Sequence, residues 1–340
     1  MRTTPDAAQE AAVGTVLEIL TGSWRSTCLY LGIRHGLPRL LGASVHQPPT
    51  AAELASLTGL PQERLRRLLR VWIDLGLVSD LPGDTYSLSD GFQCLGDDDS
   101  SIEALILLYE EDFRAAWTHA EQWLTGAATG FEVAHGMTIH QKLREDSGFA
   151  RRFLDGMGAL DLVFKHFAGY LVAHLEEGAP WTFLDVGGGG GTLARAILDR
   201  GVGVGAVQDL PHIVAGNREV LSAAGIGAHA ADFFETVPSG YNCYLLSRVL
   251  QDWDTPRSAQ ILRNIRAAVG DTGAHLWILE RAVGRGRPLS NLWDIHLGSV
   301  ASGGLRDVAE YLDLAEDTGW ITSEIIPLPF ENLAYCLHPV

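Results

Sequence analysis

A run of glycines with a carboxylate beside it is the stretch of this sequence best suited to bind a ligand. Five consecutive glycines at positions 187–191 follow the apolar run TFLDV, and Asp185 lies two residues ahead of them. A glycine loop between a strand and a helix lets the backbone approach a ligand closely. A carboxylate would repel a pyrophosphate, and no Lys-Ser/Thr pair follows the glycines, which excludes a P-loop. Asp185 instead favours a ligand with a cationic end, such as the amino group of S-adenosylmethionine.

Two further acids end the next two predicted strands. Asp209 lies roughly 20 residues past the glycine loop, where an α/β nucleoside site places an acid on the ribose hydroxyls. Asp232 and Phe233 follow the third strand. The carboxylate of Asp232 could bind the exocyclic amine of an adenine, and the Phe233 ring could pack against the face of the base. Because ligands of open α/β sheets bind at the carboxyl ends of the strands, the three acids predict one nucleoside site.

The stretch LSRVLQDWD, residues 246–254, places polar groups directly after another apolar strand. Gln251 and Asp252 crowd around Trp253 there, which suggests a catalytic position. A glutamine can hydrogen-bond, but it cannot take a proton from a substrate.

The elements that must position these residues begin at Trp181. Short β-type runs alternate with helical ones from this point, which predicts a mostly parallel sheet with helices on both faces. The last two runs, ITSEIIPL and LAYCLHPV, would add an antiparallel edge pair. We place the boundary of this Rossmann-like α/β domain near residue 170 and assign it residues 171–340.

A mostly helical segment, residues 101–170, precedes the α/β domain. It carries an apolar stripe that either packs in the core or lines a pocket for an apolar ligand, formed by Phe153, Met157, Leu160 and Phe164.

Residues 1–100 predict a winged-helix domain. Thr50 and Glu53 fit a capping box, a second helix runs from about Gln62 to Leu75, and the runs LVSD and TYSL form a hairpin around a PGD turn. This layout often reads DNA, but a net charge of −17 without a basic run opposes nucleic-acid binding. The strongly apolar helix within residues 14–42 should pack against a second chain or be deeply buried.

The composition of the chain indicates the cellular compartment in which we expect the protein. No apolar stretch approaches the roughly 20 residues that cross a bilayer, and the first residues carry acids where a signal peptide has a basic end. We therefore expect a cytoplasmic protein with no membrane partner. The four cysteines lie far apart and form no CxxC pair, which predicts reduced structural thiols and disfavours a zinc site built from thiolates.

Nearly the whole chain resembles the S-adenosylmethionine-dependent O-methyltransferases of the plant caffeate and bacterial polyketide-tailoring type. The resemblance is carried by LDVGGGGGTLARAIL, VQDLPHIV, ADFFETVP, LSRVLQDWDTPRSAQILRNIRAAV, ILERAV, GGLRDVAEYLDLAEDTGW, FEVAHGMTIHQKL and ARRFLDGM. It implies a homodimer formed by a winged-helix domain that no longer reads DNA. It also implies that Phe153 and Met157 line the space between cofactor and acceptor. The cofactor contacts that it implies are Gly187, Gly189, Asp209, Leu210, Asp232, Phe233, Ser247 and Arg248.

The catalytic residues of that family are only partly present. Plant members have a histidine base at the position of Gln251, held by two glutamates; one matches Glu280, and the other falls at Arg306. Positioning alone supplies roughly 7–11 kcal/mol of a barrier, whereas a general base adds typically about 10²–10⁴-fold. Methyl transfer without the histidine is therefore reasonable for acceptors that are already ionised or ionise easily.

Other residues could complete the acceptor side. His296, beside Trp293 in the segment that caps the acceptor pocket by resemblance, is either a packed histidine, a base or substrate hydrogen-bonder, or a metal ligand with Asp252 or Asp294. Arg306 either pairs with an anionic acceptor or lies on the surface with an acid such as Asp307 or Glu310.

Three functions follow from this pattern. The first is methyl transfer, to oxygen by default, on a small aromatic or acidic natural-product intermediate. The second keeps the cofactor for other chemistry: a pericyclic step, a decarboxylation or a hydroxylation, or C-methylation of an α-keto acid. The third is a DNA-binding regulator, which the net charge opposes.

Overall fold

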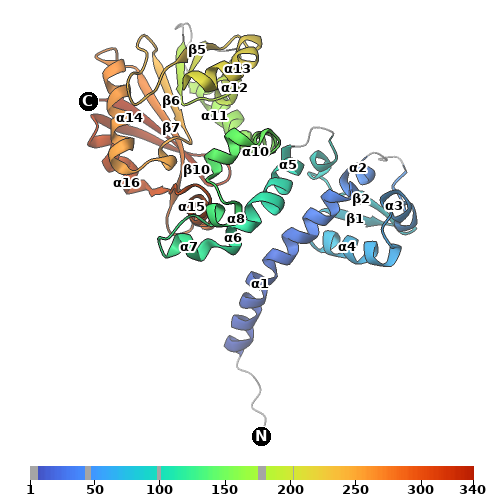
Figure 1. The fold of residues 1–340 in the computed structure, drawn as a ribbon. Helices are drawn as coiled ribbons and strands as arrows, with labels where there is room; N and C mark the ends of the chain where they lie inside the picture. The colour runs from blue at the N-terminus through green and yellow to red at the C-terminus, as the bar shows by residue number, and fades with distance from the viewer. Residues whose placement is uncertain (1–6, 43–46, 98–100, 175–180, 202) are drawn as a thin grey trace. The chain divides into compact units, whose positions relative to one another are not determined.

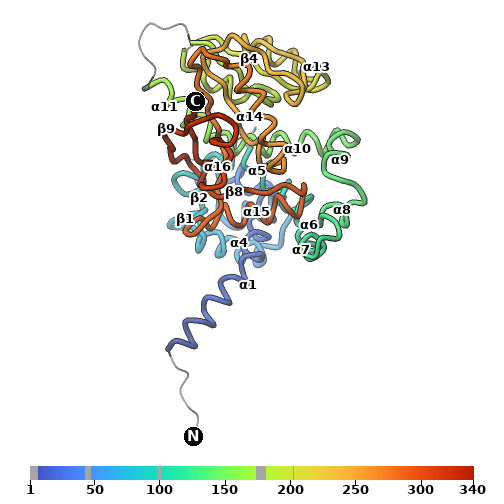
Figure 2. The backbone as a smooth tube through the Cα atoms, turned by 90° about the vertical axis from the view of Figure 1, so that its left-hand side faces the viewer, coloured from blue at the N-terminus to red at the C-terminus, as the bar shows by residue number. Residues whose placement is uncertain are grey.

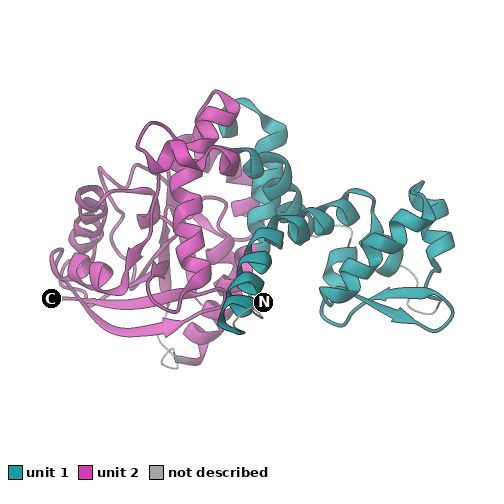
Figure 3. Ribbon diagram, turned by 90° about the horizontal axis from the view of Figure 1, so that it is seen from below, with its two compact units in different colours: residues 1–115, 142–159 teal, residues 116–141, 160–340 magenta. Residues whose placement is uncertain are grey.

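The computed structural model describes residues 7–42, 47–97, 101–174, 181–201 and 203–340. The chain divides into two compact units: Met1–Ala115 with Lys142–Ala159, and Ala116–Gln141 with Leu160–Val340 (Figure 3). We call them unit 1 and unit 2. These units divide the predicted helical segment 101–170 between them, and the functional division into three segments stays a prediction.

Unit 1 contains the elements predicted for a winged helix, namely two helices in succession and a hairpin. Thr50 and Glu53 form the predicted capping box at the start of the first of these helices, and the two strands pair antiparallel. The elements are α1 Ala7–Arg34, α2 Leu37–Gly42, α3 Ala51–Thr58, α4 Gln62–Asp74, β1 Val78–Leu81, β2 Thr85–Leu88, η1 Gln93–Gly96, α5 Ser101–Leu107, the π-helix η2 Leu108–Phe113 and α10 Ser147–Gly158. α6 Arg114–Thr118 and α9 Ile139–Glu145 cross between the units.

α1 is the apolar helix expected from the sequence, and its N-terminal half extends beyond the other elements of unit 1 (Figures 1 and 2). Trp72 of α4 packs against its C-terminal half, where a Cβ on Gly32 would lie 1.9 Å from the indole. Farther toward the N-terminus, apolar side chains at helical spacing are more than half exposed: Val13, Val16, Leu17, Leu20 and Trp24. The N-terminal half of α1 thus exposes a stripe of large apolar side chains.

Unit 2 is built on a mostly parallel sheet with an antiparallel edge, as predicted. The strand order is β5-β4-β3-β6-β7-β10-β9, and β8 pairs with β7 beside this path. β3 to β7 run parallel, whereas β10 pairs antiparallel with both β7 and β9. The strands are β3 Thr182–Val186, β4 Val204–Asp209, β5 Gly227–Ala230, β6 Cys243–Ser247, β7 His275–Val283, β8 Arg306–Asp307, β9 Trp320–Pro327 and β10 Asn332–Pro339.

Helices cover both faces of this sheet (Figure 1). Alternate residues of each strand point to opposite faces, so Leu184 and Leu246 pack toward α14 and α16, whereas Phe183 and Leu245 pack toward α11 and α12. The helices and turns of the unit are α7 Ala120–Leu124, α8 Gly130–His135, η3 Ala159–Asp161, α11 Leu162–His174, α12 Thr192–Leu198, α13 Pro211–Ala223, η4 Leu250–Asp252, α14 Thr255–Val269, α15 Pro288–Ala301 and α16 Val308–Glu316. Among the described residues, no helix combines the length and apolarity needed to cross a membrane.

Candidate active site

The glycine loop joins β3 to α12 and is shaped by glycines in left-handed conformations. Gly187 (φ 74°) donates its N–H to the Gln208 carbonyl at 2.8 Å. Gly191 (φ 77°) begins α12, and a Cβ there would lie 2.7 Å from Leu221 Cδ2. A Cβ on Gly189 (φ 52°) would meet no atom within 4 Å. The loop is therefore packed at its helical end and open at Gly189, where a ligand can approach the backbone.

Asp185 lies beneath this loop and is 2 % exposed. A Cβ on Gly188 would lie 2.7 Å from its carboxyl group, so the acid and the loop are in close contact. Burial, together with the charge of Asp209, raises the pKa of Asp185 to about 7. A cationic ligand group beside the loop would favour the ionised form of this acid.

The two other acids accept backbone hydrogen bonds at the ends of β4 and β5. Asp209 accepts hydrogen bonds from the amides of Gly189 at 2.9 Å and Leu210 at 2.7 Å. Asp232 accepts from the Phe234 amide at 2.8 Å. The neighbouring Phe233 ring lies 3.6 Å from a Cβ placed on Gly187. The acids predicted from the sequence thus lie around the open glycine loop.

Ser247 ends β6 and Arg248 follows it. Their side chains differ in whether they have interaction partners within the protein. The Ser247 hydroxyl is buried and has no hydrogen-bond partner among the described residues. A buried polar group left unpaired costs about 1–3 kcal/mol, which a polar ligand atom would offset. The Arg248 guanidinium, in contrast, donates to the Leu160 carbonyl at 3.0 Å, lies 3.7 Å from the Asp161 carboxylate and covers the Phe164 ring at 4.5 Å.

A short turn, η4, carries Gln251 and is held from two sides. Glu280 is fully buried in β7, and its Oε1 accepts from the amides of Val249 and Leu250, both at 2.9 Å. Burial, together with the charge of Asp252, raises the pKa of Glu280 to about 8. This acid holds the turn through its hydrogen bonds to the two amides.

Arg306 holds the same turn from β8. Its Nη1 donates to the Leu250 carbonyl at 2.9 Å, and its Nη2 donates to the Trp253 carbonyl at 2.8 Å. Nη2 also donates to the Ser258 hydroxyl at 3.0 Å, and the residue is only 8 % exposed. We call Glu280, Arg306 and Ser258 the turn clamp.

This position differs from both roles that the sequence suggested for Arg306. The expected surface partners Asp307 and Glu310 instead form a capping box on α16. Both terminal nitrogens of Arg306 are engaged by backbone carbonyls, so direct pairing with an anionic acceptor would break the clamp. The planar fork of the guanidinium lets Arg306 reach both carbonyls at once.

Gln251 itself is fixed through its backbone. Its carbonyl accepts from the Gly304 amide at 2.9 Å, and a Cβ on Gly303 would lie 2.8 Å from the same oxygen. Its side-chain amide makes no hydrogen bond within the described part of the chain and is therefore available to a ligand. Surrounding protein raises the pKa of the next residue, Asp252, to about 6, yet its side chain keeps contact with solvent and is ionised at neutral pH.

His296 is buried on α15 in a fixed tautomer. Its Nδ1 accepts a hydrogen bond from Trp117 Nε1 at 3.1 Å, and an indole N–H only donates, so the proton of the neutral imidazole is on Nε2. Burial lowers the pKa of His296 to about 4. Both features oppose the role of a general base and favour a neutral hydrogen-bond donor.

The aromatic neighbour predicted with it, Trp293, packs on the His296 ring with the centroids 5.7 Å apart and on the Arg281 guanidinium at 4.1 Å. Asp294 accepts from the Leu305 amide at 2.7 Å and so orders the loop beside Gln251. In the described ranges, no set of three metal-ligating side chains includes His296, Asp252 or Asp294.

The predicted apolar stripe is divided between the units. Phe153 and Met157 lie on α10 in unit 1, where Phe153 packs on Phe113 with the ring centroids 6.5 Å apart. Leu160 and Phe164 lie in unit 2, and Phe164 belongs to its core. Core packing thus explains Phe164, and the acceptor-lining role of the first two residues stays a prediction.

Sequence reasoning missed three partners of the site. Trp117 and Ser258 carried no local pattern that would connect them to His296 or Arg306. The Gly303-Gly304 pair did carry one, because adjacent glycines after a helical segment indicate a close backbone approach.

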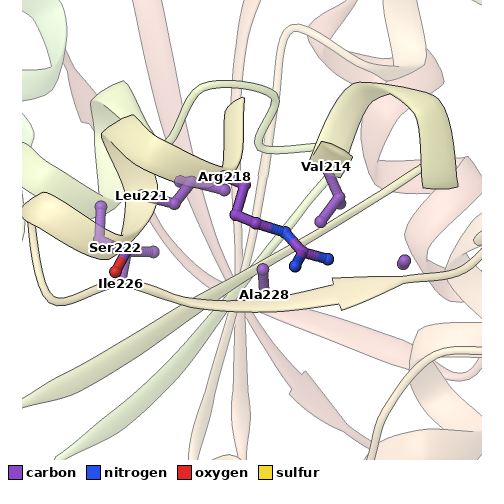
Figure 4. A pocket seen from close by; sticks show the side chains of 7 residues that line it. Val214, Arg218, Leu221, Ser222, Ile226 and Ala228 are labelled. Carbon is purple, nitrogen blue, oxygen red and sulfur yellow. The ribbon is translucent and has the colours of Figure 1, made fainter. Parts of the chain in front are cut away.

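A hollow of about 410 Å³ lies elsewhere, between α13 and β5 at the edge of the sheet. Figure 4 shows Arg218 extending from α13 toward Ala228 of β5. None of the predicted site residues lines this hollow, whose other walls are Val214, Leu221, Ser222, Ile226 and Ala230. The candidate site is therefore defined by the strand ends and not by this hollow.

Known proteins share this arrangement. A family model described as the O-methyltransferase domain matches residues 117–321. Phenazine-1-carboxylate N-methyltransferase of Pseudomonas aeruginosa is 32 % identical, over 95 % of this chain and 96 % of its own. Mitomycin biosynthesis 6-O-methyltransferase of Streptomyces lavendulae is 31 % identical, over 94 % of this chain and 93 % of its own. The structure of the pyocyanin biosynthetic protein PhzM superposes with a TM-score of 0.87 at 30 % identity, covering 97 % of this chain and 99 % of that one.

The matched region contains the glycine loop, the acids at the strand ends and the turn that carries Gln251. The chain therefore belongs to the S-adenosylmethionine-dependent small-molecule O-methyltransferases.

Proposed function

We propose that this enzyme methylates a small aromatic natural-product intermediate at an atom that carries no proton when it binds. The observation that carries the proposal is the turn at Gln251: a residue that cannot accept a proton stands there, and the clamp holds its backbone in place. His296 does not replace the base, because Trp117 occupies its Nδ1 and burial disfavours its charged form.

The strand ends suit S-adenosylmethionine, which supplies a sulfonium methyl group when bound. Gly189 offers open space beside the backbone, and Asp185 beneath the same loop would hold the cationic amino end. Asp209 is expected at the ribose, and Asp232 with Phe233 at the adenine. The unpaired Ser247 hydroxyl supports a polar ligand atom at the end of β6. Leu210 and the backbone at Arg248 complete the proposed cofactor contacts.

On the acceptor side, the side-chain amide of Gln251 is a hydrogen-bonding group that can orient a ligand without moving its proton. Trp293, in the same unit, would supply an apolar wall. Such a site favours a ring nitrogen, an ionised phenol or a carboxylate. The relative named for phenazine-1-carboxylate acts on nitrogen, whose lone pair needs no deprotonation. Positioning supplies the larger share of the barrier reduction in this scheme.

Methyl-labelled cofactor tests this function directly. The enzyme would be incubated with heteroaromatic acids, aryl carboxylates, α-keto acids and a series of phenols of graded pKa. We expect label on ring nitrogens or readily ionised oxygens, and rates on phenols that rise with pH as the phenol ionises. Product without label would overturn methyl transfer in favour of other chemistry. Fast, pH-independent methylation of weakly acidic phenols would overturn the absence of a base.

Gln251→Ala serves as the matched variant for this experiment. Loss of an acceptor hydrogen bond should lower kcat/KM by roughly tenfold, since such a bond contributes about 1–1.5 kcal/mol, and leave the pH profile unchanged. A profile that shifts in this variant would assign Gln251 a part in proton transfer and contradict the proposal.

We also propose that α1 forms a homodimer interface. Its stripe of Val13, Leu17, Leu20 and Trp24 exposes large apolar side chains at helical spacing. Leu17→Glu with Leu20→Glu should convert a dimer to a monomer in light scattering, whereas Leu57→Glu, at a leucine of α3 that is 66 % exposed, should not. A monomeric unsubstituted protein would contradict this interface.

A further inference from the structure

Two histidines and a cysteine meet at one end of the sheet in unit 2. His275 is the first residue of β7, and Cys336 and His338 lie two residues apart on β10, so they point to the same face. Leu337 pairs with Leu276 in the antiparallel register, which places His338 opposite His275 as the next pair. The two imidazole centroids are 4.3 Å apart, and Cys336 Sγ lies 3.8 Å from His338 Nε2.

This spacing matches what a tetrahedral ion requires. Zinc binds thiolate at about 2.3 Å and imidazole at about 2.0–2.1 Å, so two ligand atoms of one ion lie roughly 3.3–3.8 Å apart. In this cluster one atom of each residue lies within 4.8 Å of the others. The largest gap is thus about 1 Å too wide, a difference that side-chain rotation closes without moving the strands.

The chemistry of the three groups also selects the kind of ion. A thiolate with two imidazoles prefers zinc and similar transition metals, whereas magnesium and calcium prefer oxygen ligands. Cys336 is 5 % exposed, His338 is partly buried and His275 is exposed, so the ion would have a route from solvent. Glu324 stands opposite Cys336 in the β9–β10 register, where a carboxylate could fill a fourth position that water would otherwise take.

The cluster is separate from the catalytic machinery. It lies at the N-terminal start of β7, whereas Glu280 lies farther along the same strand, and methyl transfer uses none of its residues. We propose that His275, Cys336 and His338 bind one zinc ion that links β7 to β10. Coordination forms a Zn–S bond, and the thiol proton passes to solvent.

The test is a titration of the metal-stripped full-length protein with zinc against a chromophoric chelator. We expect one ion per chain, and a raised Tm with zinc because the ion binds the folded state. Cobalt in place of zinc should give a sulfur-to-cobalt charge-transfer band. Cys336→Ser should abolish this band and lower the affinity for zinc at least tenfold. His338→Asn should also lower the affinity for zinc at least tenfold.

Cys94→Ser and His212→Asn are the matched controls, because they remove a thiol and an imidazole outside the cluster and should leave binding unchanged. His275→Asn keeps the test valid if Cys336→Ser fails to fold, since His275 is exposed. Absence of stoichiometric binding by the unsubstituted protein would overturn the proposal. So would zinc binding by His275→Asn and His338→Asn as tight as that of the unsubstituted protein.

Discussion

The two ends of the candidate site use charged side chains in opposite ways. At the glycine loop, Asp209 accepts the Gly189 amide beside open space, and Asp185 lies buried beneath the same loop. At the Gln251 turn, Glu280 and Arg306 are buried and engaged by backbone on both sides of the turn. The glycine loop thus leaves space for a ligand, whereas the turn that carries Gln251 has its backbone fixed on both sides; under the proposed function, these are the cofactor end and the acceptor end of the site.

The sizes of two contributions to catalysis explain how methyl transfer could proceed without a general base. Orientation of the two reactants contributes roughly 7–11 kcal/mol, and a general base contributes about 10²–10⁴-fold, or roughly 3–5 kcal/mol. Loss of the smaller contribution restricts the acceptors without abolishing the reaction. The comparison between the two ends can therefore be tested by changing each end separately.

The largest effect should follow from removal of the clamp. Arg306→Ala leaves the carbonyls of Leu250 and Trp253 buried without donors, and we expect a loss of about 3 kcal/mol in the free energy of unfolding. Denaturant titration measures it, together with kcat. Arg306→Lys keeps the charge but loses the fork and should recover only part of the stability. An Arg306→Ala protein as stable as the unsubstituted one would show that the clamp does not hold the turn.

Gln251→His tests whether a base can be restored at the clamped turn. With a weakly acidic phenol we expect a gain of roughly tenfold in kcat/KM, below the usual range for a general base of about 10²–10⁴, because only Glu280 remains to orient the imidazole. Adding Arg306→Glu should lower the rate again, since it removes the clamp. No gain in the single variant, measured from pH 6 to about 9, would contradict our account of the substitution.

Cofactor binding should depend on pH through Asp185. The pKa of Asp185 in the folded protein is raised to about 7. Ionisation of this acid therefore lowers the free energy of unfolding of the ligand-free protein as the pH rises from the ordinary pKa of an aspartate toward 7. A cationic ligand removes this cost, so affinity for S-adenosylhomocysteine should rise about tenfold from about pH 6 to about pH 7.5. Calorimetry measures the slope, and Asp185→Asn should flatten it. A slope that persists in this variant would assign the titration to another group.

A difference in kind should separate two glycines of one loop. Gly191→Ala forces a Cβ to 2.7 Å from Leu221 and should destabilise folding by about 1–3 kcal/mol. Gly189→Ala meets no neighbour, so only its left-handed backbone strains it, by about 1 kcal/mol. The second variant should instead weaken cofactor binding. Equal affinity in both would indicate that Gly189 does not face the ligand.

Local sequence predicted that the acids gather around the glycine loop, but it did not predict the contacts that hold the Gln251 turn. The glycine loop and the acids at the ends of β3 and β4 are short patterns whose structural context the alternation of strands and helices supplies. The clamp joins Arg306 to a turn 53 and 56 residues earlier in the chain. The Trp117–His296 hydrogen bond spans 179 residues. Contacts of this kind depend on how β8 and α15 pack, which no local pattern in a single sequence records.

The clamp has a consequence for any attempt to change the acceptor of this enzyme. A histidine introduced at position 251 would enter a turn that a buried arginine holds from one side. Removing that arginine first would weaken the fold, and introducing the histidine first would give only a partly oriented base. Under the proposed function, neither single substitution gives an oriented base on a stable turn, so a change of acceptor class would require coordinated substitutions at both positions.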